Sequence, residues 1–117
     1  MKIAVAALKK SENSPISGQA GRAPFFLIFD DTGALVETVN NPFRVGGGGA
    51  GFGVAKMLAD KKVTTIVAEK FGGNMIGALQ ERGIEGFEAS GSAAEAVMPM
   101  SITVSRQSPN LKRAVIV

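Results

Sequence analysis

Residues 63–87 run VTTIVAEKFGGNMIGALQERGIEGF, and this stretch decides the fold. Val63–Ala68 is a β-branched run of the kind that forms a buried strand. After a glycine-rich turn, Met75–Arg82 predicts a helix that ends at Gly83, because glycine is favoured just beyond a helix C-terminus. Ile84–Phe87 then predicts a second short strand. Strand, helix and strand in this order are typical of parallel strands with helices packed on the sheet.

The residues before this unit predict another strand and a hairpin. Lys2–Leu8 is a short apolar run, and Phe25–Asn40 holds two β-prone arms joined by the turn sequence DDTG at 30–33. Lys9–Pro24 lies between them and contains no obvious element. No apolar periodicity anchors Lys9–Pro24 or Arg44–Gly53, so we expect both segments to be mobile when no ligand is bound.

Two further helices are expected, one on each side of the 63–87 unit. Gly46–Gly53 has six glycines in eight residues. Each glycine costs a helix interior about 1 kcal/mol relative to alanine, so this segment is a loop or the very start of a helix. Ser92-Ala93-Ala94-Glu95 has the form of a capping box and predicts a helix that ends before Pro99.

The order of these elements predicts an α/β fold with a mixed five-stranded sheet and helices packed on it. Lys2–Leu8 should be central, with the hairpin on one side and the two later strands on the other. We expect one domain over residues 1–99. Residues 100–117 should form a C-terminal extension or an edge strand.

Composition excludes several classes of function. The 117 residues include no cysteine and no histidine, which excludes disulfides, Cys/His zinc sites, thiol nucleophiles and histidine-based triads. The net charge of +3 permits an anionic partner without requiring one. No apolar run approaches the roughly 20 residues of a membrane-spanning helix, and the first strand is too short for a signal peptide. We therefore expect a cytoplasmic protein.

The two glycine segments are the best candidates for a binding site. Gly46–Gly51 and Gly72–Asn74 each precede a predicted helix, where unpaired backbone N–H groups and the helix dipole favour an anion. Arg22 and Lys70 could add positive charge. The alternative is that both segments are flexible connections. A nucleotide site of the P-loop type is excluded, because no Gly-Lys pair exists in the chain.

The order of several short motifs also resembles a known family. The motifs are Ser14-Pro15-Ile16-Ser17, Gly21-Arg22-Ala23-Pro24-Phe25-Phe26, Asn41-Pro42, Gly46–Gly51 and Gly72-Gly73-Asn74. Over about residues 2–98 the chain is similar to the dinitrogenase iron–molybdenum cofactor biosynthesis family, of the NifB/NifX/NafY type. The resemblance implies a ribonuclease-H-like fold. It also implies a protein that binds or carries a molybdenum or iron–sulfur cluster.

Two departures from the family pattern narrow this expectation. Members often have histidine where Gln19 stands and cysteine where Gly48 stands, so both usual metal ligands are missing. The resemblance then fits best with the orange-protein branch of sulfate-reducing bacteria, which holds a molybdenum–copper sulfide cluster without covalent attachment. Such a cluster brings its own sulfide ligands and needs an anion pocket. The residues expected to contact it are Gln19, Arg22, Gly48, Gly49, Gly51, Lys70, Gly72, Gly73 and Asn74, and we expect no protein ligand to a metal.

Three functions compete on these grounds. The first is a non-enzymatic binding or carrier protein for a molybdenum-containing metal–sulfide cluster, working with cluster-delivery or acceptor proteins. The second is a nuclease with a ribonuclease-H-like fold. It is disfavoured because two-metal chemistry needs convergent carboxylates and Lys2–Leu8 contains none. The third is a protein–protein adaptor whose pocket is vestigial. We expect neither nucleic acid nor a membrane as a partner.

Overall fold

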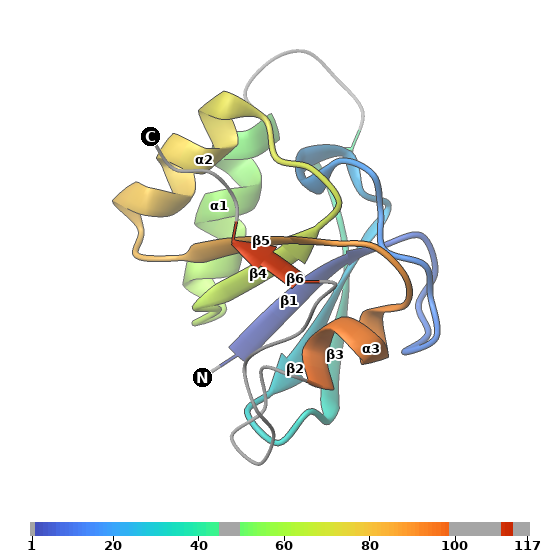
Figure 1. Cartoon of the computed structure of the whole chain (residues 1–117). Helices are drawn as coiled ribbons and strands as arrows, with labels where there is room; N and C mark the ends of the chain where they lie inside the picture. The colour runs from blue at the N-terminus through green and yellow to red at the C-terminus, as the bar shows by residue number, and fades with distance from the viewer. Residues whose placement is uncertain (1, 45–49, 99–110, 114–117) are drawn as a thin grey trace.

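The fold is built on one mixed sheet (Figure 1). The structure is a computed structural model that describes residues 2–44, 50–98 and 111–113. The strand order is β3-β2-β1-β4-β5-β6. The strands are β1 (Lys2–Ala7), β2 (Phe25–Asp30), β3 (Leu35–Asn40), β4 (Thr65–Ala68), β5 (Glu85–Ala89) and β6 (Leu111–Arg113).

The pairing confirms the predicted mixed sheet. β1, β4 and β5 are parallel neighbours, whereas β2 and β3 form an antiparallel hairpin beside β1. β1 is therefore central, with the hairpin on one side and the two later strands on the other. The five expected strands are joined by a sixth, β6, which pairs antiparallel with β5 at the edge of the sheet. β6 comes from the 100–117 segment, whose other residues lie outside the described part.

Helices cover both faces of the sheet. α1 (Ala50–Asp60) and α2 (Gly73–Glu81) lie on one face, and α3 (Ala93–Val97) lies on the other (Figure 1). The alternation within β1 supplies both cores: Ala4 and Ala6 pack with α1 and α2, and Ile3 and Val5 pack with α3. No helix in the described ranges is long and apolar enough to span a bilayer.

The helix boundaries follow the expected signals closely. α1 begins at Ala50, so the end of the glycine-rich segment forms its first turn. At α3 the predicted capping box is confirmed. The Ser92 hydroxyl accepts from the backbone N–H of Glu95 at 3.3 Å, and the Glu95 carboxylate accepts from the backbone N–H of Ser92 at 3.3 Å.

The long segment Lys9–Pro24 is tied to the sheet by polar contacts, and its mobility without a ligand stays a prediction. Ser14 is buried, and its hydroxyl accepts from two backbone N–H groups just after β1, at 3.0 and 2.9 Å. The Ser17 N–H donates to the carbonyl of Ala6 at 2.8 Å. A short 3-10 helix, η1 (Ala20–Arg22), ends the segment. Three isolated apolar residues of the segment, Ile16, Ala20 and Ala23, are also buried in the cores, and their irregular spacing gives no helix or strand period.

Candidate functional site

The candidate site lies at the carboxyl ends of the parallel strands β1 and β4. In open α/β sheets this edge is where ligands usually bind. The chain leaving β4 runs beside the segment that follows β1, and two backbone hydrogen bonds join them. The Glu69 N–H donates to the carbonyl of Ser17 at 3.0 Å, and the Ala20 N–H donates to the carbonyl of Lys70 at 3.1 Å. These bonds place η1 next to the start of α2.

The start of α1 also lies beside the start of α2, because the backbones of Gly51 and Met75 come close together. A Cβ built on Gly51 would lie 2.9 Å from the Cβ of Met75 and 3.0 Å from its Cα. On another side, a Cβ built on Gly21 would lie 3.7 Å from the backbone nitrogen of Gly51. Three element starts, those of η1, α1 and α2, therefore meet at one point.

A cavity of about 430 Å³ lies where these elements meet. Its lining combines cationic and amide groups with an apolar wall. The lining residues are Gln19, Ala20, Gly21, Arg22, Ala50, Gly51, Phe52, Lys70, Phe71, Gly72, Asn74 and Met75. Twelve residues from three separate segments thus form a concave site with few but convergent polar groups, as ligand sites usually have.

The electrostatics of the cavity favour an anion. The first turns of α1 and α2 contain no acidic residue, and Gly72, the N-cap of α2, provides no side-chain cap. The first hydrogen bond within α2 runs from Ile76 N–H to the Gly72 carbonyl at 3.1 Å, which leaves the N–H groups of 73–75 without a partner inside the helix. The positive end of the helix dipole adds to this.

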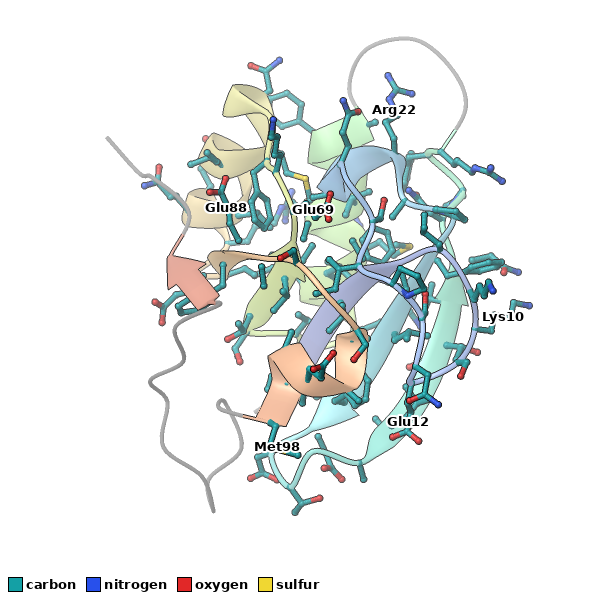
Figure 2. All side chains as sticks on the ribbon, turned by 45° about the vertical axis from the view of Figure 1, so that its right-hand side comes forward. Lys10, Glu12, Arg22, Glu69, Glu88 and Met98 are labelled. Atoms are coloured by element: carbon teal, nitrogen blue, oxygen red, sulfur yellow. The ribbon has the colours of Figure 1, made fainter. Side chains whose placement is uncertain are left out.

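Two cationic side chains contribute further positive charge. Arg22 and Lys70 both line the cavity. Arg22 projects outward from η1 at the top of the molecule (Figure 2), and its Nη1 donates to the backbone carbonyl of Arg44 at 3.4 Å. Glu69, which precedes Lys70 in the chain, is exposed. Arg22 and Lys70 therefore bring two positive charges to the lining of the cavity.

Most of the residues expected to contact a ligand surround this cavity. Those in its lining are Gln19, Arg22, Gly51, Lys70, Gly72 and Asn74. Gly73 does not belong to the lining; it begins α2 beside it, and a Cβ built there would meet nothing within 4 Å. Gly48 and Gly49 lie outside the described residues.

Sequence reasoning missed the aromatic part of the site. Phe52 and Phe71 line the cavity, and Phe52 is 52% exposed although it lies in the first turn of α1, a helix whose other face is buried. A phenylalanine between two glycines at a helix start was the available signal. Met75 packs in the core, where it is 3% exposed, and lines the cavity as well.

The donor set does not suit a bare metal ion. Within residues 2–44, 50–98 and 111–113, no group of three or more acidic, cysteine or histidine side chains could hold one. Cysteine and histidine are absent from the whole sequence. The site offers N–H donors and cations instead, which bind anions rather than metal cations.

The acidic pair at the hairpin plays a structural role far from the cavity. Asp30 pairs with Lys2 at the opposite end of β1 from the site. Its carboxylate accepts from the hydroxyl and N–H of Thr32 at 2.6 and 2.9 Å and from the N–H of Ala34 at 3.1 Å. These hydrogen bonds, led by the one from the Thr32 hydroxyl, hold the pKa of Asp30 below its ordinary value of 3.8.

The segments that form the cavity lie in a region that matches a known protein family. The sequence profile of the family described as dinitrogenase iron-molybdenum cofactor matches residues 1–101. The chain belongs to this family. The match covers every described residue of the cavity lining, so the site lies within the family's shared region. No protein of curated function matches the chain.

Two solved structures share the fold of this family member. One is an NMR structure of a putative NifB protein from Thermotoga, with a TM-score of 0.78 and 24% identity over 99% of this chain and 96% of that one. The other is the apo form of the orange protein from Desulfovibrio gigas, with a TM-score of 0.78 and 26% identity over 84% of each chain. The match of the whole sheet and its helices confirms the fold expected from the resemblance.

Proposed function

We propose that this protein is a non-enzymatic carrier for an anionic metal–sulfide cluster that contains molybdenum, held in the cavity without a covalent bond. The observation that carries the proposal is a cavity beside the uncapped start of α2, lined by cationic side chains, in a chain without cysteine or histidine. Family membership and the similarity to the orange protein support the same class of ligand. A molybdenum–copper sulfide is the form we would test first.

The chemistry of such a cluster suits the two kinds of lining. Its outer sulfides carry negative charge, so they can accept hydrogen bonds from the N–H groups of 73–75 and from Asn74 or Gln19. Sulfide is large and more weakly hydrated than oxide, so contact with Phe52, Phe71 and Met75 costs little desolvation. An oxyanion such as molybdate would lose more hydration against the same wall. We therefore expect the site to prefer thiomolybdate to molybdate.

Arg22 is the strongest single contributor we expect. A hydrogen bond from a charged group contributes about 1.5–3 kcal/mol, which corresponds to roughly ten- to a hundredfold in affinity. Arg22→Ala should weaken cluster uptake by this factor. Arg82→Ala is the matched control. Arg82 is the exposed C-cap at the far end of α2, so this substitution removes the same charge at a place remote from the cavity.

A second pair of variants tests access to the helix start. A Cβ built on Gly73 or on Gly77 meets nothing within 4 Å, so a side chain can begin at either position without a clash at its Cβ. Gly73→Val extends into the approach to the α2 amides, whereas Gly77→Val lies a full turn further along the same helix. We expect the first variant to lose cluster occupancy more severely than Arg22→Ala does and the second to retain it.

Reconstitution measures all four variants. The protein is incubated with tetrathiomolybdate and copper, freed of excess reagents, and assayed for visible absorbance and metal content. Parallel incubation with molybdate tests the preference for sulfide. Unchanged uptake in both Arg22→Ala and Gly73→Val would show that the ligand binds elsewhere.

Protein purified from its native host decides between a carrier and an adaptor. A carrier should show visible charge-transfer bands and contain molybdenum. A colourless, metal-free native protein that also fails to take up the cluster in vitro would contradict the proposal and favour a protein–protein adaptor with a vestigial pocket.

A further inference from the structure

We propose that Gly51 is a positioning residue. It lets the first turn of α1 pack against the backbone of α2 and so sets the spacing of the N–H donors around the ligand. This inference rests on the function proposed above, and it changes the role first expected for Gly51, that of a direct contact to the anion. The residue acts through Met75 and the first turn of α2.

The evidence is the closeness of the two backbones. A Cβ built on Gly51 would lie 2.9 Å from Met75 Cβ, 3.0 Å from Met75 Cα and 3.2 Å from Met75 N, whereas ordinary contact begins near 3.4 Å. Any side chain at position 51 must therefore separate the two helix starts by about 0.5 Å. Met75 cannot turn aside, because two of the three contacts are to its backbone and its side chain is 3% exposed.

The first turn of α1 has little room to retreat. A Cβ built on Gly53 would lie 2.5 Å from the ring of Phe43, so this ring already rests on the helix. On the other side lies η1: a Cβ built on Gly21 would lie 3.7 Å from the backbone nitrogen of Gly51, so η1 is the next element that a displaced α1 would meet. A displacement caused at position 51 is therefore passed to the amides at the start of α2 or to η1, which carries Arg22.

A shift of the α2 amides and a shift of η1 would both disturb how the donor groups converge on the ligand. N–H donors at 73–75 have to converge on one anion, and hydrogen bonds weaken steeply when their distance or angle departs from the optimum. A site needs its groups held to within about 0.5 Å of the productive geometry. We expect Gly51→Ala to lower the affinity for the cluster at least tenfold while the protein stays folded.

Salt dependence separates this role from a charge effect. Arg22→Ala removes a charge, so the dissociation constant should depend less on salt than in the wild type. Gly51→Ala removes no charge, so its weaker binding should keep the wild-type salt dependence. Gly77→Ala is the matched control: it is the same substitution in the neighbouring helix, at a position where a Cβ meets nothing within 4 Å, and it should bind as the wild type does.

The experiment measures dissociation constants for tetrathiomolybdate with copper, at low and at moderate salt, in the wild type and the three variants. Retained amide dispersion in the NMR spectrum checks that Gly51→Ala is folded. If the single variant does not fold, the comparison is made in the Gly77→Ala background, where the added alanine stabilises α2.

The outcomes are distinct. Weaker binding by Gly51→Ala with unchanged salt dependence supports the positioning role. Equal binding by Gly51→Ala and Gly77→Ala overturns that role and leaves the proposed function standing. No uptake by the wild type under any of these conditions overturns the proposed function, and the positioning role falls with it.

Discussion

Replacing Gly72 by aspartate should stabilise the protein and weaken cluster binding at the same time. Gly72 is the N-cap of α2, with φ −71° and ψ 153°, an extended conformation that aspartate adopts readily. A Cβ built there meets nothing within 4 Å. The new carboxylate can cap the free N–H groups of the first turn, which are the groups that we expect to bind the anion.

The two effects have opposite signs and different sizes. Aspartate gains a few tenths of a kcal/mol over glycine as an N-cap and about 0.3–1 kcal/mol from the helix dipole, so the free energy of unfolding should rise by up to about 1 kcal/mol. A unit charge about 6 Å from the ligand repels each ligand charge by about 3 kcal/mol at an effective dielectric constant of about 20. Solvent screening at this exposed position reduces that value, so we expect affinity to fall by roughly ten- to a hundredfold.

Asparagine at the same position is the matched control. Gly72→Asn caps the helix with a neutral group of nearly the same shape, so it should stabilise α2 and weaken binding much less than aspartate does. Thermal unfolding measures stability, and uptake of tetrathiomolybdate with copper measures binding. A Gly72→Asp protein that is more stable and still takes up the cluster like the wild type would refute the idea that the start of α2 binds the anion.

Three further predictions concern the fold. Gly77→Ala should stabilise α2 by up to about 1 kcal/mol and raise the melting temperature by several degrees, and a lower melting temperature would contradict the open space found around Gly77. Ser14→Ala should cost about 1–3 kcal/mol in urea unfolding, because a buried hydroxyl that accepts from two backbone N–H groups is lost, and a change near zero would show that water replaces it. Since the pKa of Asp30 lies below 3.8, its ionised form stabilises the turn at neutral pH, and this contribution is lost as the pH falls through the lowered pKa. Asp30→Ala should therefore destabilise the protein at pH 7 and have much less effect well below pH 3.8, whereas a pH-independent difference in urea unfolding would contradict this.

The sheet and its helices follow from local signals that the sequence carries plainly. The β-branched run of β4, the glycine that ends α2 and the Ser92–Glu95 capping box each depend on a few neighbouring residues. Their order then permits few topologies, because parallel strands need crossover connections. The sixth strand, β6, is three residues long and has no comparable local signal.

The site was only partly predictable because it depends on contacts between distant segments. Glycine before a helix predicted an anion-binding helix start at Gly72, where a Cβ would meet nothing within 4 Å. The same pattern at Gly51 serves close packing against Met75. Only the tertiary structure separates these two uses of glycine. The aromatic wall formed by Phe52 and Phe71 was missed for a similar reason, since a phenylalanine is expected in the core unless its surroundings are known.

The central claim is that an anionic metal–sulfide cluster binds in the cavity between η1 and the starts of α1 and α2. The most direct measurement is a titration of the uniformly ¹⁵N-labelled protein with tetrathiomolybdate and copper, followed through the backbone amide resonances. We predict the largest changes at residues 72–75, at 50–52 and at 19–22. Changes centred on the β2–β3 turn or on α3, or a coloured protein whose cavity amides do not respond, would contradict it.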